Sequence, residues 1–219
     1  MNGTLIQLLV LAGIAIFLIL KLRSVLGTRE GFEKPPVPLE DQSSRGKRDF
    51  EVIEGGKDRD IIDHVPEGSP SAGALAEMKK AEPSFAVTPF LEGARGAYEM
   101  ILMAFERGEL DQVRSFLSDE VEASFAEAIA ARQRDGLTVE ASFLGLKDIG
   151  LEEATFSRDT GMAEITVRFV GEQTYMVRNQ AGEIVEGNAR DIKRQRDLWT
   201  FARRMGSSDP NWQLVATGD

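Results

Sequence analysis

The side chains that most often carry out enzymatic chemistry are scarce in this sequence. The chain has no cysteine and one histidine, His64, which leaves no thiolate nucleophile and no pair of histidines for a metal ion. A general base in residues 85–219 would have to be a carboxylate or a tyrosine, Tyr98 or Tyr175, and no spacing selects one pair of carboxylates. Residues 55–57 (GGK) lack the upstream glycine and the following serine or threonine that a phosphate-binding loop requires. We therefore expect a non-catalytic protein without a cofactor or metal ion.

Large aromatic residues are the candidates for a binding site. In a domain built from helices on a sheet, such side chains can line a cavity for an apolar peptide or another ligand. The same side chains can instead fill the core, and the sequence leaves both arrangements open. The candidate pocket residues are Tyr98, Phe105, Trp199, Phe201 and Trp212.

A basic run near the C-terminus is a candidate contact for an anionic surface, either lipid or ribosome. Each cation near such a surface contributes about 1 kcal/mol, which is enough for weak docking of a tethered domain. The alternative is a solvated strand face whose charges are balanced by Asp191 and Asp197. The basic residues are Arg190, Lys193, Arg194 and Arg196.

Composition favours one folded, acidic domain. An apolar fraction of 42% with 7% aromatic residues supports a packed core rather than global disorder. The net charge of -10 repels phosphate backbones, so we expect no nucleic-acid partner.

The N-terminus has the pattern of a membrane anchor. Residues 1–20 contain no charged side chain, and about 20 helical residues span the roughly 30 Å of a bilayer core. Lys21, Arg23 and Arg29 follow, which places this end in the cytoplasm by the positive-inside rule. We expect a single-pass anchor in a bacterial inner membrane, with the C-terminal domain cytoplasmic. It comprises residues 1–22, with the apolar residues Leu5, Ile6, Leu8, Leu9, Val10, Leu11, Ile14, Ile16, Phe17, Leu18, Ile19 and Leu20.

A polar spacer follows the anchor. Residues 23–84 are rich in proline, glycine and mixed charges, which predicts a flexible, mostly disordered linker. Residues 50–53 (FEVI) and 61–65 (IIDHV) are short apolar islands, which fit either ordinary linker or a segment that docks on a partner. Residues 72–80 predict a brief helix, and His64 is expected to be a linker residue.

Residues 85–219 have the pattern of an α+β domain. We predict a helix over residues 89–107, with Thr88 as its N-cap and Gly108 as the glycine that ends it. A short helix is expected over residues 110–117, and Ser118 caps a third that ends near Arg134. Alternating apolar residues then predict a curved antiparallel sheet with strands at 140–146, 151–156, 163–169, 198–203 and 212–217.

Three segments carry a resemblance to a known family: residues 90–98 (FLEGARGAY), 197–203 (DLWTFAR) and 209–217 (DPNWQLVAT). They resemble the bacterial branch of the import-motor scaffold family. That family is defined by the C-terminal domain of the mitochondrial inner-membrane translocase subunit that recruits the matrix heat-shock chaperone. The resemblance implies the cone-shaped fold of nuclear transport factor two, and protein partners such as a heat-shock chaperone or translocase components.

The combined pattern predicts a membrane-anchored, non-catalytic scaffold or adaptor. It would bind protein partners at the cytoplasmic face of the inner membrane, in protein translocation or membrane protein assembly. Two alternatives stay open: a pocket-containing ligand-binding domain or enzyme of the same fold, and a lipid- or ribosome-docking module.

Overall fold

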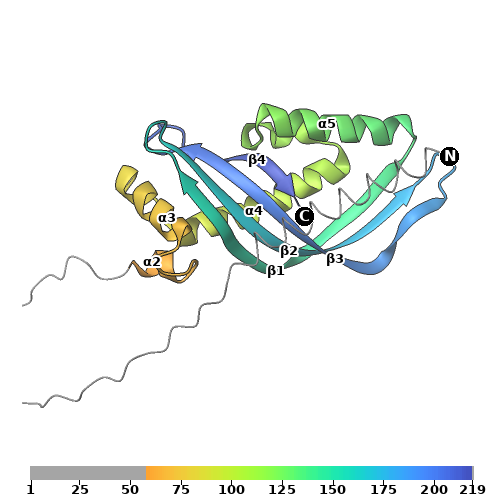
Figure 1. The fold of residues 1–219 in the computed structure, drawn as a ribbon. Coiled ribbons are helices and arrows are strands. Elements are labelled where there is room, and N and C mark those ends of the chain that lie inside the picture. Colours follow the sequence, from red (N-terminus) through yellow and green to blue (C-terminus); the bar gives the residue numbers. More distant parts are fainter. Residues whose placement is uncertain (1–57, 219) are drawn as a thin grey trace, which may run out of the picture. The chain divides into compact units, whose positions relative to one another are not determined.

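The computed structural model describes residues 58–218 (Figure 1). The expected anchor and residues 50–53 lie outside this part. Within it, no helix combines the length and the apolar character needed to cross a membrane. The elements are α2 (Arg59–Ile62), α3 (Pro70–Ala81), α4 (Val87–Arg107), η1 (Leu110–Gln112), η2 (Arg114–Phe116), α5 (Asp119–Arg134), β1 (Thr138–Phe156), β2 (Met162–Arg178), β3 (Ile184–Arg204) and β4 (Gln213–Gly218).

The four strands form one antiparallel sheet in the order β1-β2-β3-β4. The helices α3 and α4 pack against β1, and α5 packs against β4 (Figure 1). The expected α+β class, with helices on an antiparallel sheet, is therefore confirmed. The short strand β4 pairs with β3 only from Leu198 to Ala202, so within the described residues the first part of β3 has one unpaired edge.

The first strand differs from its prediction. Residues 140–146 and 151–156 belong to one continuous strand, β1, which stays paired with β2 through three shifts of register. The intervening residues 147–150 resemble a turn in sequence, but bulges let a strand absorb extra residues without leaving the sheet.

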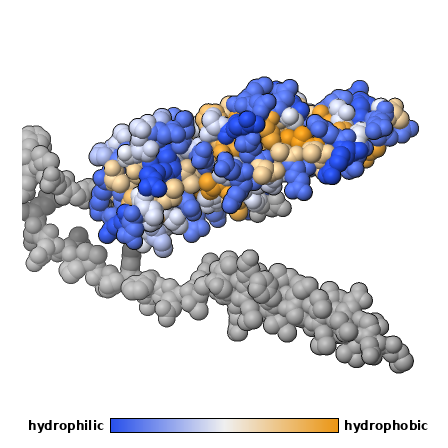
Figure 2. All heavy atoms as spheres, turned by 90° about the horizontal axis from the view of Figure 1, so that it is seen from above, coloured by the Kyte–Doolittle hydropathy of each residue, from blue (hydrophilic) through white to orange (hydrophobic). Residues whose placement is uncertain are grey.

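The core lies between α4 and the sheet. The alternating residues of β2, Ala163, Ile165, Val167 and Phe169, are all fully buried, as predicted. The helix α4 buries a broad apolar stripe and ends at Gly108, whose positive φ of 75° suits glycine at a helix terminus. Figure 2 shows apolar side chains gathered along the middle of the face seen from above, with hydrophilic ones around them.

The start of α4 is capped by a residue remote in sequence. The prediction that Thr88 is the N-cap is wrong, because Ala86 occupies that position and supplies no side-chain hydrogen bond. Instead Asp60 of α2 accepts hydrogen bonds from the backbone N–H groups of Val87 (2.7 Å) and Thr88 (3.0 Å). Lys79 of α3 lies 2.8 Å from the same carboxylate. A carboxylate at a helix N-terminus also interacts favourably with the helix dipole.

The expectation of a disordered spacer is wrong for residues 58–84. Ile61, Val65, Leu75 and Met78 are buried in the core that α4 and the sheet share. The prolines mark turns and helix starts here, since Pro70 is the first residue of α3. His64 is also part of this structure, with its Nε2 atom 3.0 Å from the Thr88 hydroxyl.

The two segments after α4 follow the prediction more closely. Residues 110–117, expected as a short helix, form the two 3₁₀ turns η1 and η2. The predicted cap of the next helix is confirmed, because the Ser118 hydroxyl accepts the N–H of Val121 at 3.3 Å.

An aromatic groove and an acidic cavity beside the central helix

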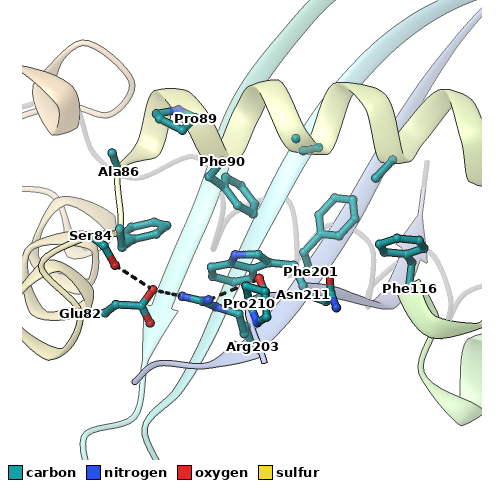
Figure 3. A pocket seen from close by; sticks show the side chains of 15 residues that line it. Glu82, Ser84, Ala86, Pro89, Phe90, Phe116, Phe201, Arg203, Pro210 and Asn211 are labelled. Carbon is teal, nitrogen blue, oxygen red and sulfur yellow. Dashed lines mark hydrogen bonds and ion pairs between the residues drawn. The ribbon is translucent and has the colours of Figure 1, made fainter. Parts of the chain in front are cut away.

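The first candidate site, here called the aromatic groove, is a hollow of about 330 Å³ between α4 and the loop that joins β3 to β4. Figure 3 shows Glu82 and Phe116 at opposite ends, with Phe90 and Phe201 between them. The lining residues are Glu82, Ser84, Phe85, Ala86, Pro89, Phe90, Gly93, Ala94, Ala97, Phe116, Phe201, Arg203, Pro210, Asn211 and Trp212.

Aromatic rings from three parts of the chain meet in the groove. The ring centroids of Phe90 and Trp212 lie 4.8 Å apart, and those of Phe90 and Phe201 lie 6.1 Å apart. Phe85 lies 6.0 Å from Trp212 on the other side. These tilted and edge-to-face contacts hold the rings in fixed orientations, so the groove has a rigid apolar lining.

One ion pair lies in this apolar lining. The Arg203 guanidinium donates to Glu82 at 2.6 Å, and Glu82 also accepts the backbone N–H of Gly206 at 2.9 Å. The hydrogen bond from Arg203 lowers the pKa of Glu82, so the carboxylate stays ionised at neutral pH. The Arg203 side chain is only 8% exposed, and its Nε atom has no partner among the described residues. The groove therefore contains a neutralised ion pair, and the Arg203 Nε atom is buried behind its lining.

The wall that α4 contributes is made of small residues. Pro89, Gly93 and Ala97 are spaced four residues apart, so they lie on one face of the helix. A Cβ added at Gly93 would meet no atom within 4 Å. Glycine inside a helix costs about 1 kcal/mol relative to alanine, and packing in this domain does not require it. The open space leaves room for another chain to approach α4 closely.

The second candidate site, here called the acidic cavity, is a hollow of about 260 Å³ further along α4. It is bounded by the C-terminal half of α4, by α5, and by β3 and β4. The lining residues are Leu102, Phe105, Glu106, Phe125, Gln195, Asp197, Trp199, Thr217 and Gly218.

A polar network holds Asp197 in place. The hydroxyl of the fully buried Tyr98 donates to Asp197 Oδ2 at 2.5 Å, and the Gln195 amide donates to the same oxygen at 3.0 Å. Gln173 donates in turn to Gln195 at 3.1 Å. Burial and the hydrogen bond to Asp197 both raise the pKa of Tyr98, so the phenol stays protonated and can donate to Asp197. Its oxygen also accepts a hydrogen bond from the Gln195 amide at 3.3 Å.

The other carboxylate of the cavity, Glu106, lies on α4. Arg132 of α5 donates to Glu106 Oε2 at 3.1 Å, and the guanidinium lies 4.5 Å from the Phe105 ring. Burial raises the pKa of Glu106 in spite of this ion pair. The single partner therefore does not fully compensate the buried charge.

The structure separates the five candidate pocket residues into three places. Phe201 and Trp212 line the aromatic groove, and Phe105 and Trp199 line the acidic cavity. Tyr98 lines neither, because it is stacked on Phe169 with 4.4 Å between the centroids. Glu82 and Arg203 were not among the candidates. They are 121 residues apart, and no local pattern links them.

The four basic candidates do not form one surface. Lys193 and Arg194 are neighbours in a strand, so their side chains point to opposite faces of the sheet. Arg194 pairs with Glu172 at 2.8 Å, whereas Lys193 lies 5.2 Å from the Tyr175 ring. Arg190 lies in a bulge where the pairing of β3 with β2 shifts between Asn188 and Ile192. Arg196 is exposed further along β3.

Comparison with known proteins identifies the domain. The model of the Tim44-like domain matches residues 71–219. The mitochondrial import inner membrane translocase subunit TIM44-1 of Arabidopsis thaliana is 22% identical over 145 residues, which cover 66% of this chain and 30% of that protein. The mitochondrial import inner membrane translocase subunit TIM44 of Homo sapiens is 24% identical over 144 residues. These residues cover 64% of this chain and 31% of that protein.

The matched stretch thus spans about a third of the length of these relatives. Among solved structures, the intermembrane space region of the chloroplast protein ARC6 is similar with a TM-score of 0.40 and 12% identity. The similarity covers 58% of this chain and 94% of that one. The likeness to nuclear transport factor two stays a prediction. Because the family model covers more than half of the sequence, this chain belongs to the Tim44-like domain family.

Proposed function

We propose that this protein is a non-catalytic scaffold, anchored in a bacterial inner membrane by residues 1–22, that holds a protein partner at the cytoplasmic face. The aromatic groove is the observation that carries the proposal. It would receive an apolar segment of the partner, and the anchor would keep that partner close to the membrane.

The chemistry of the groove favours an apolar protein segment. Rigid aromatic side chains such as Phe90 and Trp212 supply much of the binding energy at protein interfaces. The Arg203–Glu82 pair is already neutralised, so it does not select a strongly charged ligand.

The partner class follows from the family. The relatives are named as subunits of the mitochondrial import inner membrane translocase, which supports a partner among translocase components. A heat-shock chaperone that acts on translocated chains is the second partner of this class. A tether would raise the local concentration of either one, so a modest affinity of the groove would be enough.

Site-specific photocrosslinking in cells tests the proposal. A photoreactive amino acid replaces Asn211, an exposed residue of the groove wall, in the full-length chain. The control position is Glu127, which is exposed on α5 outside the groove. We expect Asn211 to give an adduct with a translocase component or a heat-shock chaperone, and Glu127 to give none.

Two matched variants decide whether the groove is responsible. Gly93→Leu places a side chain in the groove, whereas Gly96→Leu adds the same side chain to an exposed position that does not line it. We expect Gly93→Leu to abolish the Asn211 adduct and Gly96→Leu to retain it. Equal adducts in both variants, or a lipid or metabolite as the main ligand of the purified protein, would contradict the proposal.

A further inference from the structure

We propose that the acidic cavity binds a side-chain-sized organic cation, either an alkylammonium or a guanidinium group. This site is separate from the aromatic groove, and its occupancy does not depend on the scaffold function proposed above.

Two carboxylates face the cavity from different elements, Glu106 from α4 and Asp197 from β3. Among hydrogen bonds between described residues, Glu106 accepts only at Oε2 and Asp197 only at Oδ2. Glu106 Oε1 and Asp197 Oδ1 therefore remain as acceptors. A bound cation can donate to both oxygens, and such charge-assisted hydrogen bonds are the stronger kind.

The charges around the cavity leave a deficit of cations. Arg132 compensates Glu106 from α5, and Lys193 of β3 acts on it from a greater distance, whereas Glu186 repels it. No basic residue of the described part forms an ion pair with Asp197. Burial raises the pKa of Glu106 in spite of Arg132, and an additional cation in the cavity would lower it.

Aromatic rings complete the site. Phe105, Phe125 and Trp199 line the cavity, and the centroids of the two phenylalanines are 4.7 Å apart. Aromatic faces attract cations, most strongly when water is excluded. The guanidinium of Arg132 lies 4.5 Å from the centroid of Phe105, so one ring of the cavity already pairs with a planar cation of the domain itself.

The size of the cavity limits the ligand. Pockets for drug-sized molecules have volumes of roughly 300 to 1,000 Å³, and the acidic cavity is slightly smaller at about 260 Å³. It therefore fits one alkyl chain with a cationic head. Such a group can belong to a free amine or to a lysine or arginine of a partner protein.

The two tryptophans of the chain provide a readout, since Trp199 lines the acidic cavity and Trp212 lines the aromatic groove. The full-length protein is labelled with 5-fluorotryptophan, placed in phosphatidylcholine nanodiscs and followed by ¹⁹F NMR. Trp212→Phe assigns the two signals. We expect n-butylammonium to shift the Trp199 signal saturably and to leave the Trp212 signal unchanged, whereas the neutral 1-pentanol shifts neither in the same range.

Variants then test the two carboxylates. Glu106→Gln and Asp197→Asn are each expected to weaken n-butylammonium binding about tenfold, because each removes one charge-assisted hydrogen bond. Glu99→Gln removes the same charge from an exposed position of α4, and its affinity should equal that of the wild type. Thermal unfolding of every variant verifies the fold, and Glu106→Gln provides the decisive result if Asp197→Asn disturbs the Tyr98 network.

Capped tripeptides with a central lysine or arginine identify the source of the cation. A peptide that binds at least as tightly as n-butylammonium assigns the cavity to a side chain of a partner, and binding of the free amine alone assigns it to a small molecule. The proposal is overturned if no cation shifts Trp199 saturably, if 1-pentanol acts equally, or if Glu106→Gln binds like Glu99→Gln. Crosslinking from Asn211 would be unaffected by these results, so the two proposals can fail separately.

Discussion

At the scale of single residues, the contacts that matter most join parts of the chain that are far apart. Asp60 caps a helix that begins 27 residues later, and Glu82 pairs with Arg203 across 121 residues. The groups that these carboxylates satisfy include the half-buried N–H of Val87 and the buried guanidinium of Arg203. A buried polar group without a partner costs about 1–3 kcal/mol.

Loss of the Asp60 carboxylate should destabilise the start of α4. We expect Asp60→Ala to lower the free energy of unfolding by about 1–2 kcal/mol, the usual cost of losing an N-cap, measured by urea denaturation at pH 7. Glu127→Ala, which changes an exposed residue of α5, is the control and should have little effect. Equal stabilities of the two variants would show that water replaces the cap without cost.

The same carboxylate gives a pH dependence of known sign. Burial raises the pKa of Asp60, but hydrogen bonds from Lys79 and from the N–H groups of Thr88 and Val87 lower it by more, well below its ordinary value of 3.8. The unfolded state therefore binds the proton more readily. The stability difference between wild type and Asp60→Ala should be complete above about pH 5 and should shrink as the pH falls below the ordinary pKa.

At the scale of elements, α3 is a structural part of the domain. Leu75 is fully buried, so Leu75→Ala should cost about 2–5 kcal/mol of unfolding free energy, whereas Lys80→Ala on the exposed side of α3 should cost almost nothing. Urea denaturation distinguishes the two. A negligible effect of Leu75→Ala would mean that α3 does not contribute to the core in solution.

The helix α4 contains two glycines, Gly93 and Gly96, at positions where an added Cβ would meet no atom within 4 Å. Gly93→Ala and Gly96→Ala should each stabilise the protein by about 0.5–1 kcal/mol, because both positions have space for a Cβ and alanine favours the helix. Thermal unfolding measures both effects. A loss of stability at Gly93 alone would indicate that the groove is tighter than its geometry suggests.

The sequence predicted those elements whose signals are local. The alternation at 163–169, Gly108 and the Ser118 cap are each contained within a few residues, and all three are confirmed. The first half of β3 has no such alternation, because it is exposed on both faces, and residues 58–84 have few apolar residues to indicate a core. The two cavities depend on side chains that only the folded chain brings together.

At the scale of the whole molecule, the proposed anchor and the domain are expected to have separate roles. The domain includes buried residues from Ile61 onward, so we expect removal of residues 1–22 to leave its thermal unfolding unchanged. The same deletion should move the protein from the membrane fraction, from which alkaline carbonate does not extract it, to the soluble fraction. Release of the full-length chain by carbonate would rule out an anchor that spans the bilayer.

The short pairing of β4 has a consequence for how the protein avoids self-association. A long unpaired strand edge is a template for aggregation, and the exposed Ile184, Val185 and Ile192 would add to the hazard. The bulge at Arg190 and the charges around it interrupt this edge, so another strand cannot pair along it continuously. We therefore expect the bulge and the charges beside it to disfavour strand pairing between crowded copies of the chain, an effect that requires no binding partner.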